Sequence, residues 1–214
     1  MNLIELIDDC DVDGIEALVR RCGVDALNTP QTVDEDVKEL PLYYAARSAA
    51  PTHLIAGLLE LGATPQAIDK YDIPVIWLAV HDCTENFERA PLQALLNAGV
   101  HADELVDVQY RATPLMMACR HSVCCTTMLL KYGASHSATD IYRQTPLHHV
   151  ARLNDVSGAL AHDEVVVIAR MLLDSGASRS VRDDLGRTPS DTLEFFAWTD
   201  LELAARLRKI IAPS

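Results

Sequence analysis

The sequence predicts an all-α repeat solenoid in which antiparallel helix pairs are joined by β-hairpin-like loops. Two observations lead to this fold class: a tripeptide with a central proline recurs along the chain, and a Leu-Leu-x-x-Gly pattern recurs between those prolines. Hydrophobic residues make up 49% of the 214 residues, which is enough to form a core. The length suits one large domain, two small ones or an elongated array of repeats.

Each proline tripeptide is predicted to begin a helix. A Thr before the proline accepts hydrogen bonds from free N–H groups of the first turn, and Pro at the first helical position loses no hydrogen bond. The prolines are 33, 40, 32 and 43 residues apart, which indicates a repeat. The five tripeptides are Leu40-Pro41-Leu42, Ile73-Pro74-Val75, Thr113-Pro114-Leu115, Thr145-Pro146-Leu147 and Thr188-Pro189-Ser190.

The Leu-Leu-x-x-Gly pattern is predicted to end a helix, with leucines facing the core and Gly in the left-handed conformation. From each Gly to the next Pro, 12 to 15 residues leave room for a polar extended hairpin. From each Pro to the next Gly, 19 to 30 residues fit two short antiparallel helices. The copies begin at Leu58, Leu95, Leu129 and Leu172, with a degenerate copy at Leu18.

This pattern resembles the ankyrin repeat. Thr145-Pro146-Leu147-His148-His149-Val150-Ala151 is close to the family's Thr-Pro-Leu-His-x-Ala, and residues 113–118 match except at the His position. The resemblance implies a structural role for His148, whose imidazole would form hydrogen bonds within the repeat. It covers about residues 3–211 and implies a single ankyrin repeat domain over 1–214. Its parts are an N-terminal capping repeat at 3–28, repeats at 36–68, 69–105, 106–138 and 139–181, and a C-terminal capping repeat at 183–211.

Two inter-helix turns are longer than the pattern requires, near residues 82–89 and 154–163. Long turns in a repeat protein usually lie on one face and can contribute to binding. Drift in a tolerant loop explains them equally well.

The charge balance disfavours nucleic acid as a partner. The chain has 31 Asp plus Glu against 18 Lys plus Arg, a net charge of -13 and a pI of about 4.9, so phosphate backbones repel it. Residues 1–40 hold 11 of the acids and only 3 bases.

No apolar run is long enough to span a membrane, and the N-terminus lacks the features of a secretory signal, so we expect no membrane partner and a cytoplasmic location. The six cysteines form no CxxC pair, and in that location we expect reduced thiols.

The sequence gives little support for a catalytic function. There is no HExxH run, no zinc-type Cys/His spacing and no Gly-rich phosphate loop, so we expect no enzyme, no metal and no cofactor. Asp183-Asp184 is a paired carboxylate that we expect in a solvated hairpin turn. Cys124-Cys125 lies in an apolar stretch, where packing is a better explanation than nucleophilic catalysis.

A protein-binding surface is better supported. The resemblance implies that positions on the first helices and at the hairpin tips face a concave groove. Those positions are rich in Trp, Tyr, Met and Arg, which are common at interface hot spots, and contain no Asp or Glu. The partner-binding candidates are Tyr44, Arg47, Tyr71, Trp77, His81, Tyr110, Arg111, Met117, Arg120, His121, Tyr142, Arg143, His149 and Arg152.

Two functions remain open at this point. One is a non-enzymatic adaptor that binds a partner protein through the groove and the hairpin tips, and that is monomeric when free. The other is a dedicated inhibitor, of immunity or regulatory type, that forms a tight one-to-one complex with a basic enzyme or toxin. In the second case the acidic surface steers the partner, and the long turns contribute contacts.

Overall fold

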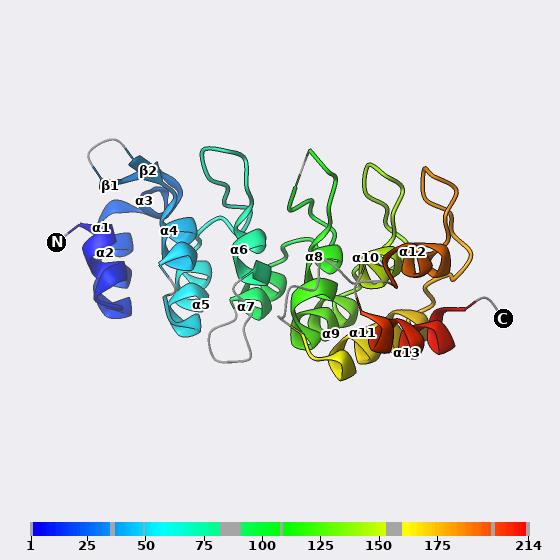
Figure 1. The fold of residues 1–214 in the computed structure, drawn as a ribbon. Coiled ribbons are helices and arrows are strands. Elements are labelled where there is room, and N and C mark those ends of the chain that lie inside the picture. Colours follow the sequence, from blue (N-terminus) through cyan, green and yellow to red (C-terminus); the bar gives the residue numbers. More distant parts are fainter. Residues whose placement is uncertain are drawn as a thin grey trace. The chain divides into compact units, whose positions relative to one another are not determined.

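The computed structural model describes residues 2–212, except 35–36, 49, 82–90, 108, 153–159 and 198–199. The chain divides into two compact units, Met1–His101 and Ala102–Ser214, and each is described by itself (Figure 1). The structure is 56% helical, with thirteen helices and two short strands in its described part, so the all-α prediction is confirmed at that level. The predicted turn at 82–89 and most of the turn at 154–163 lie outside the described residues.

The first unit contains helices in two layers. Helices α1, α4 and α6 contact one another in sequence order, and α2, α5 and α7 do the same (Figure 1). The strands β1 and β2 pair antiparallel, with an irregularity between Thr32 and Asp34. The elements are α1 (Leu3–Asp8), α2 (Val12–Cys22), α3 (Asp25–Asn28), β1 (Gln31–Asp34), β2 (Val37–Glu39), α4 (Pro41–Arg47), α5 (Thr52–Glu60), α6 (Val75–His81) and α7 (Leu92–Asn97).

The second unit has the same arrangement of helix pairs. Helices α8, α10 and α12 contact in sequence order in one layer, and α9, α11 and α13 in the other. Its helices are α8 (Pro114–His121), α9 (Val123–Lys131), α10 (Pro146–Ala151), α11 (His162–Asp174), α12 (Pro189–Phe196) and α13 (Leu201–Ile211).

The proline tripeptides begin helices as predicted, with one difference. Proline is the first residue of α4, α8, α10 and α12. Thr188 Oγ1 accepts a hydrogen bond from the Asp191 N–H at 3.2 Å, which caps α12. Pro74 instead lies just before α6 and forms an isolated β-bridge with Ile68.

The glycines of the Leu-Leu-x-x-Gly copies follow the second helices and hold the left-handed conformation, with φ of 100° at Gly62 and 101° at Gly176. Glycine takes this conformation at little cost, so the predicted helix ends are confirmed. The first leucine of each of the four full copies, such as Leu95 or Leu129, is buried in the core of its unit.

The cysteines differ in part from expectation. Cys10, Cys22, Cys119 and Cys124 are free, and burial raises the pKa of the Cys119 thiol to about 12. Cys125 is disulfide-bonded, so the expectation that every thiol is reduced is wrong at this residue.

None of the described helices is long and apolar enough to cross a membrane. The cytoplasmic location stays a prediction.

Candidate protein-binding site

Three hairpins of the second unit, at 107–112, 140–144 and 183–187, are each closed by an aspartate. The Asp140 carboxylate accepts hydrogen bonds from the Tyr142 and Gln144 backbone N–H groups at 2.9 and 2.8 Å. Asp183 accepts from the Leu185 and Arg187 N–H groups at 3.0 and 2.8 Å. Asp107 accepts from the Tyr110 N–H at 2.9 Å. Because each carboxylate is turned toward its own backbone, the tip side chains are left facing solvent.

Backbone hydrogen bonds join these hairpins into one row. The Ile141 N–H donates to the Tyr110 carbonyl, and the Asp184 N–H to the Tyr142 carbonyl, both at 3.0 Å. The rings of Tyr110 and Tyr142 lie 6.5 Å apart between centroids and are more than 40% exposed, while Leu185 is 69% exposed. We call Tyr110, Arg111, Tyr142, Arg143 and Leu185 the tip ridge. It offers contiguous apolar surface, which in a folded protein often marks an interaction site.

Arg111 and Arg143 hold left-handed backbone conformations at the turns, with φ of 54° and 58°. The same position in the third hairpin is Gly186, with φ of 74°. Both arginine side chains are exposed, and neither forms a hydrogen bond or ion pair in the described part of the chain. An L-residue pays roughly 1–2 kcal/mol in this conformation. The two arginines therefore occupy positions that backbone energetics would assign to glycine.

Arg143→Gly is expected to raise the free energy of unfolding by about 0.5 kcal/mol. Relief of the left-handed conformation is worth roughly 1–2 kcal/mol, and the greater freedom of glycine in the unfolded chain offsets roughly 0.4–1 kcal/mol of it. Urea unfolding measures the change. As a control, Arg170→Gly at an exposed position of α11 should lower stability by about 1 kcal/mol. A loss larger than that in Arg143→Gly would mean that the Arg143 side chain stabilises the fold.

A cavity of about 400 Å³ lies next to the tip ridge. Arg152 Nη1 donates to Gln144 Oε1 at 3.2 Å, and Gln144 Nε2 donates to Asp183 Oδ2 at 3.3 Å. Arg187 donates to the same oxygen from Nε at 3.0 Å and Nη2 at 2.8 Å. These bonds hold both guanidinium groups in place. The cavity is lined by Tyr142, Gln144, Arg152, Asp184, Leu185, Arg187 and Phe196.

Asp183 corrects one expectation. It was predicted in a solvated turn, yet it is only 2% exposed, whereas Asp184 beside it is exposed. Burial alone would raise the pKa of Asp183, but hydrogen bonds from the Arg187 side chain and backbone outweigh it and hold the pKa below its usual range. The carboxylate turns inward because it closes the hairpin and neutralises Arg187.

His148, in α10, is fully buried and connects two repeats. Its Nδ1 accepts a hydrogen bond from the Thr145 backbone N–H at 3.1 Å, so Nε2 carries the proton and donates to the Arg187 carbonyl at 3.1 Å. The bond to Thr145 is the contact within the repeat that the resemblance implies. Burial lowers the pKa of His148, and the imidazole is therefore neutral.

Five of the candidates lie in the first unit. The Tyr44 hydroxyl donates to Asp8 at 2.7 Å, and Arg47 pairs with Glu39 at 3.1 Å. On α6, Trp77 stacks on His81, with ring centroids 4.7 Å apart and planes 12° apart. Tyr71 is 70% exposed in the hairpin before α6.

The other nine candidates lie in the second unit, and the structure brings two of them, Tyr142 and Arg152, to one cavity. His149 is almost buried, and its Nε2 donates to Asp140 at 3.0 Å. On α8, Met117, Arg120 and His121 are half-buried. The hairpin tips contain the remaining candidates, Tyr110, Arg111 and Arg143.

Leu185 was not predicted from the sequence, although it stands three residues before Thr188, as Tyr142 stands before Thr145. That register was the signal that could have found it.

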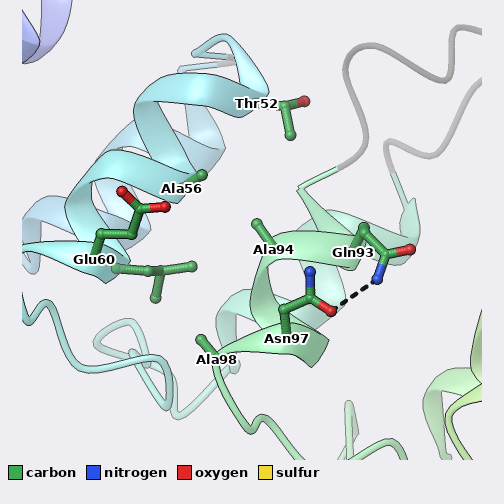
Figure 2. A pocket seen from close by; sticks show the side chains of 8 residues that line it. Thr52, Ala56, Glu60, Gln93, Ala94, Asn97 and Ala98 are labelled. Carbon is green, nitrogen blue, oxygen red and sulfur yellow. Dashed lines mark hydrogen bonds between the residues drawn. The ribbon is translucent and has the colours of Figure 1, made fainter.

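A second cavity, of about 410 Å³, lies in the first unit between α5 and α7 (Figure 2). Gln93 donates to Asn97 at 3.0 Å on one wall, and Glu60 is the one charged residue among those that line it. The second helices of two pairs form the walls of this cavity, and no partner-binding candidate was predicted on them. It is lined by Thr52, Ala56, Leu59, Glu60, Gln93, Ala94, Asn97 and Ala98.

Charge differs sharply between the two units. Residues 1–101 contain 17 acids and 6 bases, whereas residues 102–214 contain 14 acids and 12 bases. Nearly all of the net negative charge therefore belongs to the first unit.

Within the described residues, no group of three or more His, Cys, Asp and Glu side chains is placed to hold a metal ion.

No family model and no curated protein matches this chain. Among solved structures, it is similar to a chain in the structure of predatory endopeptidase Bd0816 from Bdellovibrio bacteriovorus bound to immunity protein Bd3460, which is a complex of two proteins. The TM-score is 0.69 at 20% identity, and the match covers 98% of this chain and 97% of that chain. At this identity the similarity shows a shared fold. Membership of the ankyrin family stays a prediction.

Proposed function

We propose that this chain is a non-enzymatic inhibitor of immunity type, which binds one partner enzyme in a one-to-one complex. The observation that carries the proposal is the structural similarity, because it spans nearly the whole of both chains and its solved counterpart comes from an endopeptidase–immunity protein complex. It favours the inhibitor over the general adaptor, although both bind protein.

The proposed architecture is a single ankyrin-type repeat stack. Within each unit, successive helix pairs pack layer on layer, and prolines begin most of the first helices. His148 bonds to Thr145 in its own repeat and to Arg187 in the next. A side chain that bonds to its own repeat and to the next supports a stack in which neighbouring repeats stabilise one another.

The non-enzymatic part of the proposal is supported by what the histidines and aspartates do. His148 is held neutral between two backbone partners, and His149 is bound to Asp140. Asp140 and Asp183 close hairpins through their own backbones. These groups, which could otherwise serve acid–base chemistry, stabilise the structure that presents the tip ridge.

Partner association is expected to slow steeply with salt, because the acidic first unit steers a basic partner. Raising ionic strength from about 0.1 to 1 M shortens the screening length from about 10 to about 3 Å, and the association rate should fall at least about 10-fold. The partner is first captured from native lysate with the tagged full chain and identified by mass spectrometry. Stopped-flow measurements with the purified partner then give the rate.

A matched pair of variants tests the steering. Asp9→Asn with Asp25→Asn removes two exposed charges from the first unit and should slow association at low salt. Asp174→Asn with Glu202→Gln removes two exposed charges from the second unit and should change it less. A single partner whose activity is blocked at one equivalent supports the inhibitor. Several partners, retained through high salt with activity unchanged, would identify an adaptor instead.

A further inference from the structure

The tip ridge repeats one pair of side chains in register. Tyr stands three residues before Thr113 and before Thr145, and Arg follows it each time, giving Tyr110-Arg111 and Tyr142-Arg143. Because the two hairpins are joined through the Ile141 N–H and the Tyr110 carbonyl, the pairs lie side by side. An aromatic surface therefore runs along the ridge, and an exposed arginine follows each tyrosine in the sequence.

The carboxylates of Asp140 and Asp183, which close two of these hairpins, do not neutralise the ridge. One Asp140 oxygen accepts from the Tyr142 and Gln144 N–H groups, and the other accepts from His149. In the next hairpin Asp183 is buried against Arg187. The Asp140 and Asp183 carboxylates thus face inward, and Asp184 is the exposed acid beside Leu185. Arg111 and Arg143 face solvent with no partner in the described residues. On a chain of net charge -13, this is a local cationic surface.

Stability does not account for the two arginines, because each stands in the left-handed conformation in which the third hairpin has Gly186. Strained residues tend to persist where function requires them. Tyr and Arg are also the residue types that dominate the affinity of protein interfaces.

We propose that the tip ridge binds an acidic segment of the partner protein, in which carboxylates flank an apolar side chain. The carboxylates pair with Arg111 and Arg143, where guanidinium groups form charge-assisted hydrogen bonds. The apolar side chain enters the cavity of about 400 Å³ between Tyr142, Leu185 and Phe196. This inference rests on the proposed function only in assigning the segment to the inhibited enzyme. The chemistry of the segment follows from the ridge itself.

Selection from a displayed library of random peptides tests the inference without knowledge of the partner. Peptides of about 12 residues are long enough, when extended, to reach along a surface of about 40 Å. The immobilised full chain should enrich peptides that combine Asp or Glu with Leu, Phe or Trp. Arg111→Glu with Arg143→Glu should weaken the selected peptides about 100-fold, corresponding to about 10-fold for each charged hot-spot contact.

Control variants separate charge from folding. Lys131→Glu with Arg170→Glu makes the same charge change on exposed positions of α9 and α11, and peptide affinity should stay within about 2-fold. Arg111→Gly with Arg143→Gly removes the guanidinium groups without adding backbone strain, and should lose binding with its melting temperature retained.

Several results would overturn the inference. The immobilised chain could enrich basic or uncharged peptides, or it could enrich no peptide whose binding depends on the ridge. The selected peptides could also bind the double Glu variant as tightly as the unchanged chain. Tight binding of single-stranded oligothymidylate that the same variant abolishes would assign the ridge to nucleic acid instead. The proposed function fails separately, when acidic peptides bind the ridge but the captured partner keeps its activity. Conversely, if the inhibited enzyme binds the double Glu variant with unchanged affinity, the inhibitor function is supported and the tip ridge is excluded as its binding site.

Discussion

Asp183→Ala is expected to lower the free energy of unfolding by about 4 kcal/mol. The Asp183 side chain has no exposed surface, and it accepts hydrogen bonds from the Leu185 and Arg187 backbone and from the Arg187 guanidinium group. Its removal leaves buried N–H groups without an acceptor and leaves a largely buried cation without its counter-charge. Breaking one side of a buried ion pair typically costs about 3–5 kcal/mol.

The neighbouring residue supplies the control for this prediction. Asp184 has the same chemistry but is exposed, so Asp184→Ala should change stability by less than about 0.5 kcal/mol. Urea unfolding followed by circular dichroism gives both values, and hydrogen exchange should accelerate at the Leu185 and Arg187 amides in Asp183→Ala alone. Equal effects of the two substitutions would contradict the buried network at the cavity.

The loss of Asp183 also has a consequence for binding. Its carboxylate closes the third hairpin and fixes Arg187 and, through Gln144, Arg152. Those residues line the cavity beside the tip ridge. Asp183→Asn keeps the shape and removes the charge, so it should retain more stability than Asp183→Ala while still loosening Arg187.

The sequence was sufficient where the information is local. A proline at the start of a helix and a glycine after its end act within a few residues, so the first residues of α8, α10 and α12 followed from the Thr-Pro positions. Four members of the tip ridge were also predicted, because the Tyr-Arg pairs stand at fixed places before Thr113 and Thr145.

The rest depends on contacts between repeats, which a linear pattern does not show. An aspartate before a turn has the same appearance whether it is solvated or buried, so Asp183 was assigned to the wrong environment. Its burial arises from Arg187 and from Gln144, 39 residues earlier in the chain. The cavity between α5 and α7 depends on how two helices pack, and small residues such as Ala56 and Ala94 carry no periodic signal for it.

His148→Ala is expected to lower the free energy of unfolding by about 3 kcal/mol. The substitution leaves a cavity in α10 and removes the acceptor for the Thr145 N–H and the donor to the Arg187 carbonyl. His53 is an exposed residue of α5, and His53→Ala should cost less than about 0.5 kcal/mol in the same urea titration. A cost below about 1 kcal/mol for His148→Ala would show that the imidazole does not join the two repeats energetically.

The pH dependence of stability gives an independent readout of the same residue. Burial holds the pKa of His148 below its usual value, so just below the ordinary pKa of about 6.5 the unfolded chain binds more protons at this imidazole than the folded chain does. Stability from this group is therefore complete above about pH 6.5 and is lost as the pH falls through the folded pKa. Asp140 and Asp183 act in a lower window, because their lowered pKa values cost stability only below about pH 4. His148→Ala should consequently reduce the slope of stability against pH just below 6.5 and leave the acid limb in place. An unchanged slope would mean that folding does not shift the pKa of His148, and it would contradict the buried neutral imidazole.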